Sequence, residues 1–157
     1  MVQYIPQYLV AVVGMAVGGS AGLLLAAAIN RRSVDAQRLD GWDARFTIPL
    51  LLAAAGAHLA LVPVVELQRQ LMFGLYVSAL IITVALALVG WRIWRLGAVL
   101  LPLGSILAYA YFAGQVHEAD VVGLLVKIVE LAAAAAALRP VIAARSLRGR
   151  NRSVTSG

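Results

Sequence analysis

One stretch near the C-terminus constrains the fold more than any other part of the chain. Residues 121–138 are apolar except for Lys127 and Glu130, and a run of this length is close to the ~20 residues that cross a bilayer as a helix. A lysine and a glutamate three residues apart lie on one helix face, within reach of each other. Because ionisable side chains at membrane depth are costly, they face protein and find a partner. The run therefore predicts a membrane helix in a bundle that shelters this pair.

The whole chain is too apolar to be a water-soluble domain. Of its 157 residues, 62% are hydrophobic and 13% are charged, and the mean hydropathy is +0.91. Soluble domains carry about 25% charged residues, so the surface of this protein must face lipid instead of water. The chain has no cysteine, which excludes disulfides and thiolate metal sites.

Five apolar segments predict an all-α integral membrane bundle of about five transmembrane helices. They cover, in order, residues 8–29, 46–66, 71–90, 97–114 and 120–139. The fourth is short and contains Pro102 and Gly104, so a four-span alternative makes it re-entrant or peripheral. We expect the bundle to occupy residues 1–143 and to be followed by a basic, disordered cytoplasmic tail at residues 144–157.

A glycine stripe marks the first segment. Gly14, Gly18 and Gly22 recur every four residues, which aligns them on one helix face where a second helix can approach closely. The simplest interpretation is helix packing against a neighbouring segment of the same chain. Contact between copies in a homo-oligomer, or chance in a Gly- and Ala-rich span, are the alternatives.

The basic residues predict the orientation in the membrane. With five spans, eleven of the thirteen Lys and Arg residues fall on the side of the loop 30–45 and the tail, and only Arg69 falls on the opposite side. Because cytoplasmic loops carry an excess of Lys and Arg, this distribution predicts a plasma-membrane protein with its N-terminus outside and its C-terminus in the cytoplasm. A four-span chain would place the basic tail outside.

A polar site is predicted in the outer half of the membrane. At 1.5 Å per helical residue, His58 lies roughly 12 Å inside the outer end of its segment. Lys127 and Glu130 lie at similar depth, roughly 10 and 15 Å. Asp120, Gly123, Lys127 and Glu130 share one face of the last segment, and Gly123 thins that face. The candidate intramembrane site therefore consists of His58, Lys127, Glu130 and Asp120.

Two interpretations of this site stay open. Lys127 and Glu130 either form a neutralised pair that only holds helices in register, or belong to an outward-opening polar pocket or proton-responsive site. His58 is either a core histidine hydrogen-bonded across helices or a ligand. Further polar residues lie in the outer halves of their helices, on faces that the sequence does not fix: Tyr76, Ser78, Tyr109 and Tyr111.

Other chemistry has little support in the sequence, which contains no P-loop, GxSxG, HExxH or dinucleotide motif. The usable ligand types for zinc or copper are His58, Glu66, His117, Glu118 and Asp120. They lack a ligand spacing such as HxxxH, and a bis-histidine haem would need both histidines at matching depth. We therefore expect no metal, no cofactor and no nucleic acid, since the basic tail is explained by topology and anionic lipid.

Two stretches carry a resemblance. Residues 56–63 read GAHLALVP and residues 120–130 read DVVGLLVKIVE. They are similar to uncharacterised small Ala-rich multi-pass membrane proteins of high-GC bacteria, in which "HL..P" precedes a final helix with "D..G...K..E". The resemblance covers segments two to five and carries no assigned activity. It implies that His58, Lys127 and Glu130 recur together.

These observations favour a non-enzymatic membrane protein, either an accessory subunit or a sensor, with its polar site built on His58, Lys127 and Glu130. The alternative is a small transporter or proton-coupled carrier, oligomeric through the glycine stripe. A membrane redox or haem protein is the third interpretation. The expected partners are the lipid bilayer and either a second copy of the chain or a larger membrane complex.

Overall fold

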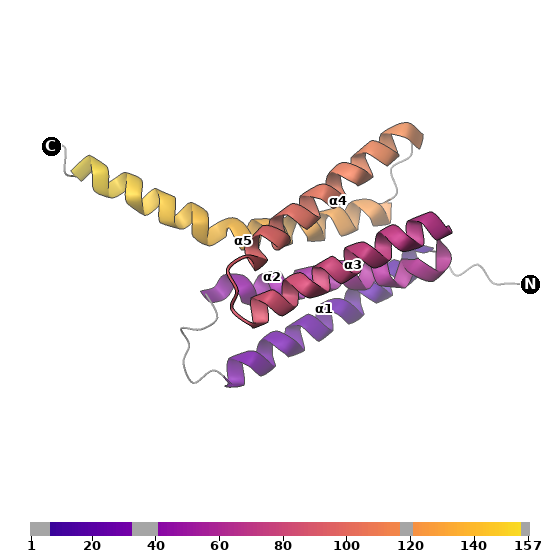
Figure 1. The fold of residues 1–157 in the computed structure, drawn as a ribbon, viewed down its shortest axis with the longest axis horizontal. Helices are drawn as coiled ribbons and strands as arrows, with labels where there is room; N and C mark the ends of the chain where they lie inside the picture. The colour runs from indigo at the N-terminus through magenta and orange to yellow at the C-terminus, as the bar shows by residue number, and fades with distance from the viewer. Residues whose placement is uncertain (1–6, 33–40, 117–120, 155–157) are drawn as a thin grey trace, which may run out of the picture.

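The computed structural model describes residues 7–32, 41–116 and 121–154, all of them in or between helices (Figure 1). The elements are α1 (Gln7–Arg32), α2 (Gly41–Leu61), the 3₁₀ helix η1 (Val62–Val64), α3 (Leu67–Leu88), α4 (Trp94–Val116) and α5 (Val121–Val154). Each of the five α-helices is long and apolar enough to cross a membrane. The prediction of an all-α, multi-pass membrane protein with five spans is confirmed.

Helix α4 is long and apolar enough for a full membrane span. It runs for 23 residues, or about 35 Å at 1.5 Å per residue. Pro102 lies inside the helix and is buried. A proline in a membrane helix is tolerated where neighbouring helices and local adjustments satisfy the freed backbone groups. Pro102 and Gly104, on which the four-span alternative rested, therefore do not interrupt the helix, which is long enough to cross a membrane.

The connection between α2 and α3 lies earlier in the chain than the sequence predicts. Helix α2 ends at Leu61, and η1 follows, because Pro63 has no N–H with which to continue the helical hydrogen bonds. Residues 67–70, which separate the predicted segments 46–66 and 71–90, form the first turn of α3. There the Gln70 N–H donates to the Glu66 carbonyl at 2.9 Å. The Gln70 side chain donates to the Val65 carbonyl at 2.8 Å. These polar residues therefore begin a helix instead of forming a loop.

The last helix is longer than its membrane span. Helix α5 continues beyond the span Val121–Arg139 to Val154, and its C-terminal part extends away from the other helices (Figure 1). The backbone is thus helical over most of residues 144–157, where the sequence predicts disorder. This segment contains Ala, Leu and Arg, which favour helix, and it extends a helix that is already nucleated.

Helix α2 lies at the centre of the bundle and packs against α1, α3 and α5. The largest fully buried aliphatic side chains are Ile48 and Leu51 of α2 and Leu80 of α3. Around them the core is built mainly from alanines, which let helix backbones approach closely in a lipid environment. The core alanines are Ala44, Ala54, Ala55, Ala87, Ala98, Ala133 and Ala137.

The glycine stripe of α1 faces α2 within the same chain. A Cβ atom added at any of the three glycines would collide with the α2 backbone. The collisions are between Gly14 and Gly56, between Gly18 and Leu52, and between Gly22 and Pro49. The absence of side chains at these three positions of α1 allows the two helices to approach closely, as the simplest interpretation of the stripe expects. Because α2 occupies this surface, a homo-oligomer would have to use another face.

The close approach of α1 and α2 predicts that a single added methyl group at Gly18 is destabilising. Overpacking of an interior costs roughly 1–3 kcal/mol, so Gly18→Ala should lower the free energy of unfolding by that amount. The matched control is Gly104→Ala on α4, where an added Cβ meets no atom within 4 Å and alanine favours the helix by up to about 1 kcal/mol. Thermal unfolding in detergent measures both variants. Equal melting temperatures would contradict this packing.

Candidate functional site

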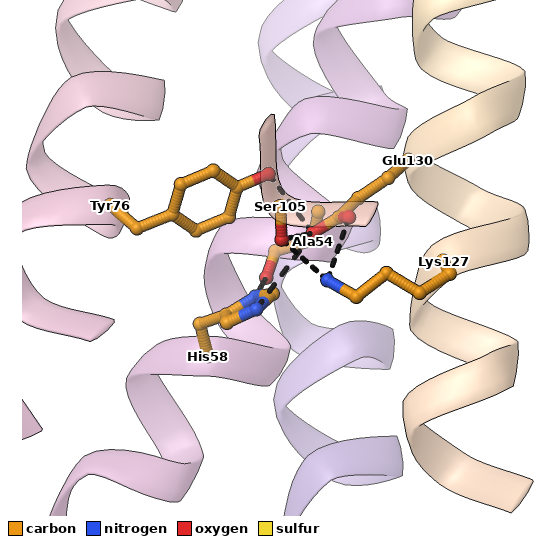
Figure 2. A network of polar contacts seen from close by, with 6 residues as sticks. All are labelled: Ala54, His58, Tyr76, Ser105, Lys127 and Glu130. Carbon is orange, nitrogen blue, oxygen red and sulfur yellow. Dashed lines mark hydrogen bonds and ion pairs between the residues drawn. The ribbon is translucent and has the colours of Figure 1, made fainter. Parts of the chain in front are cut away.

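The carboxylate of Glu130 on α5 lies at the centre of a polar cluster, and its side chain has no exposed surface (Figure 2). Its Oε1 accepts hydrogen bonds from the Tyr76 hydroxyl of α3 at 2.9 Å and from the Ser105 hydroxyl of α4 at 3.1 Å. Its Oε2 accepts one from the Lys127 ammonium at 2.8 Å. A buried carboxylate stays ionised at tolerable cost only when it is paired and hydrogen-bonded, and three donors meet that requirement here.

Lys127 supplies the opposite charge and is itself enclosed, with 12% of its side chain exposed. Its ammonium also donates to the Ser105 hydroxyl at 2.5 Å, so Ser105 bridges the two charged residues. The Tyr109 ring of α4 covers the ammonium, with 5.9 Å between Nζ and the ring centroid, which is within the range of a cation–π contact. A Cβ atom at Gly123 of α5 would collide with this ring. The glycine thus makes room for the tyrosine that covers Lys127.

His58 of α2 approaches the same carboxylate from a fourth helix (Figure 2). Its Nδ1 lies 2.8 Å from the Ala54 carbonyl oxygen, and since a carbonyl only accepts, Nδ1 carries a proton. The other ring nitrogen, Nε2, lies 3.8 Å from Glu130 Oε1, which is beyond hydrogen-bond distance. The rings of Phe73 and Tyr76 contact His58 edge to face, with centroids 5.2 and 4.8 Å away. The imidazole is therefore held in place with Nε2 directed at a carboxylate oxygen.

The structure brings three of the four predicted site residues together. Lys127 and Glu130 form the ion pair that their spacing predicts, and His58 lies beside them. Asp120, the fourth, lies outside the described residues. Gly123 lies on the same helix face and admits an aromatic ring, as expected of a residue that thins this face.

Two members of the cluster, Tyr76 and Ser105, do not follow from the sequence. Tyr76 is one of several polar residues in outer halves, and Ser105 carries no distinctive motif. One usable signal exists: Ser105 and Tyr109 are four residues apart, so they share a face of α4, and both contact Lys127. Ser78, which the sequence weighs equally with Tyr76, lies on the exposed surface.

The cluster is arranged to hold a proton more readily than a metal ion. Among the side chains that the structure describes, no three His, Asp or Glu residues gather as metal ligands. The positive charge of Lys127, bonded to the same carboxylate, disfavours a second cation there. His117, which a bis-histidine haem would require, lies outside the described residues. In contrast, Nε2 of a neutral His58 can accept a proton that then faces Glu130.

No protein-family model, curated protein or solved structure matches the chain. The similarity to small Ala-rich membrane proteins of high-GC bacteria therefore stays a prediction. The fold and the site define a class by themselves: a five-helix multi-pass membrane protein with a buried cluster of Glu130, His58 and Lys127.

The ion pair predicts strong energetic coupling between Lys127 and Glu130. Lys127→Met leaves a buried carboxylate without its counter-ion, and Glu130→Gln leaves a buried ammonium without its own. Breaking a buried pair in this way costs roughly 3–5 kcal/mol, whereas removing both charges can be nearly neutral. The double variant should therefore be less destabilised than either single variant. Reversible unfolding of the four proteins in detergent gives the coupling energy.

The matched control for this cycle is Arg69→Met, because Arg69 is exposed. A surface substitution of this kind changes stability by no more than about 0.5 kcal/mol. Strictly additive effects of the Lys127 and Glu130 substitutions would show that the two residues do not interact and would contradict the cluster as described.

Proposed function

We propose that this membrane protein is a non-enzymatic sensor or accessory subunit in which His58 binds a proton. The observation that carries the proposal is the position of His58 Nε2, 3.8 Å from Glu130 Oε1. Nδ1 is committed to the Ala54 carbonyl, so an added proton goes to Nε2 and creates an N–H directed at a carboxylate. Charge-assisted hydrogen bonds of this type are 2.7–2.9 Å long, so a movement of about 1 Å closes the gap.

Proton binding changes the net charge of the cluster. With neutral His58, the charges of Lys127 and Glu130 cancel, and with protonated His58 the cluster carries one positive charge. Histidine is the side chain whose unperturbed charge change falls between pH 5 and 8. A charge that appears at membrane depth must be accommodated by its surroundings. The cluster can thus convert a change in pH into a change in helix contacts.

The charge distribution of the chain supports proton entry from the outer side of the plasma membrane. Eleven basic residues lie on the side of the tail and one on the other, which favours an outside N-terminus and a cytoplasmic C-terminus. The start of α1 and the end of α5 lie at opposite ends of the bundle (Figure 1), which suits an odd number of crossings. His58 is six residues from Val64, where its span ends, or about 9 Å.

The test is the protonation state of the His58 ring, followed by nitrogen NMR in lipid nanodiscs. The chain has two histidines, so the variant His117→Gln leaves His58 as the single reporter. We expect Nδ1 to stay protonated and hydrogen-bonded at every pH, and Nε2 to gain a proton as the pH falls from 8 to 5. The matched control is Glu130→Gln in the same background, in which the protonated form loses its counter-charge and should be less populated at each pH.

A ring that stays in one neutral state over this range would contradict the proposal and leave the cluster a structural device. Measuring proton flux in proteoliposomes distinguishes a sensor from a proton-coupled carrier. The proposal expects no His58-dependent proton flux across the membrane, whereas a flux that is lost in His58→Gln would assign the proton-coupled carrier instead.

A further inference from the structure

Two hydroxyl donors and one unprotonated ring nitrogen converge on one oxygen of Glu130. Oε1 accepts hydrogen bonds from the Tyr76 hydroxyl at 2.9 Å and from the Ser105 hydroxyl at 3.1 Å. A carboxylate oxygen offers about two lone-pair sites, so these two bonds fill it. His58 Nε2 faces the same atom at 3.8 Å. A protonated His58 therefore gains its hydrogen bond to Oε1 only if one of the two hydroxyls gives way.

We propose that Ser105 is the hydroxyl that gives way, so that protonation of His58 loosens the attachment of α4 to the cluster. The inference rests on the proposed proton binding at His58 and adds the helix that responds to it. The Ser105 bond is the longer of the two. A serine on a helix also has a second acceptor within reach, which is the backbone carbonyl four residues earlier.

The chain already uses this alternative bond in the neighbouring helix. The Ser78 hydroxyl donates to the Gly74 carbonyl at 2.8 Å, and the Thr83 hydroxyl donates to the Ala79 carbonyl at 2.8 Å. Rotation about one side-chain bond gives Ser105 the same partner on α4. Its hydroxyl therefore exchanges one hydrogen bond for another and is not left unsatisfied.

Tyr76 has no such alternative on its own backbone. A phenol hydroxyl stands too far from its own backbone to bond it, and a buried hydroxyl without a partner is costly. The Tyr76 ring also packs edge to face on His58, with centroids 4.8 Å apart, which holds its hydroxyl at Oε1. Tyr76 should therefore stay bonded to Glu130 and keep α3 attached to α5.

Electrostatics act in the same direction. The titratable side chains around the cluster are Tyr76 from α3, Tyr109 from α4, and Lys127 and Glu130 from α5. Helix α1 has no charged side chain between residues 8 and 28. A positive charge on His58 repels the Lys127 ammonium, which is the other partner of Ser105. Both contacts that fasten Ser105 to the cluster are thus weakened by the same proton.

Helix α4 also has room to respond. It diverges from α3 beyond the turn that joins them (Figure 1). Its outward side chains Leu103, Leu107 and Tyr111 lie on the surface of the bundle. A change at Ser105 therefore meets little resistance from neighbouring helices on that side.

The experiment uses the absence of cysteine in the chain, which allows one introduced cysteine to carry a trifluoromethyl label. Leu107→Cys reports on α4 two residues after Ser105, and Leu75→Cys reports on α3 next to Tyr76. The two native side chains are matched in exposure, at 70% and 73%. In lipid nanodiscs, lowering the pH through the His58 titration should shift the ¹⁹F resonance at position 107 and leave that at position 75 in place.

Variants identify the cause of the shift. It should be lost in His58→Gln, which cannot take up the proton, and in Ser105→Ala, which has no hydroxyl to displace. Ser105→Thr keeps the hydroxyl and the alternative backbone bond, so it should retain the shift. A purely through-space effect of the His58 charge would appear at position 75 as well, because that label is next to the Tyr76 ring, which packs on His58.

A pH-dependent shift at position 75 equal to or larger than that at position 107 overturns the inference, because Tyr76 would then be the group that gives way. Unchanged resonances at both positions, while nitrogen NMR shows His58 gaining a proton, also overturn it and leave proton binding intact. A His58 ring that never titrates contradicts the proposed function, and this inference fails with it.

Discussion

The ionised carboxylate of Glu130 is the constraint on which the arrangement of four helices depends. Burying such a group costs several kcal/mol even after relaxation, unless an opposite charge and hydrogen bonds compensate. Here the compensation comes from three helices: Lys127 lies on the same helix, Tyr76 on α3 and Ser105 on α4. His58 of α2 approaches without bonding. The Glu130 carboxylate thus joins α3, α4 and α5, and the titratable His58 ring of α2 lies next to it.

Helix α1 is attached by a different means. Lipid is as apolar as leucine, so membrane helices gain little from the hydrophobic effect when they associate and depend on close packing and polar contacts. Helix α1 uses the first of these, through glycines that lie directly on the backbone of α2. Helices α2 to α5 use both close packing and polar contacts: alanines form much of their core, and the polar cluster around Glu130 joins them. The α1–α2 pair can therefore stay fixed while contacts at Glu130 change.

The parts of the structure that follow local rules could be predicted from the sequence. Five spans follow from the lengths of apolar runs, and the Lys127–Glu130 contact follows from helical spacing. The role of Ser105 could not be predicted, because it depends on the angle at which α4 meets α5, and no local pattern encodes that angle. The start of α3 was also beyond local rules, since the polar residues around Gln70 are equally compatible with a loop until their bonds are known.

The charge state of Glu130 tests this account most directly, because all three hydrogen bonds to its carboxylate come from donors, as an ionised carboxylate requires. The chain has three glutamates, Glu66, Glu118 and Glu130, so ¹³C labelling of glutamate carboxyl groups yields three resonances, and the one lost in Glu130→Gln belongs to the buried group. In nanodiscs at neutral pH, the account predicts an ionised carboxylate at Glu130 whose resonance moves in Lys127→Met. A protonated carboxyl group at neutral pH, insensitive to Lys127, would contradict it.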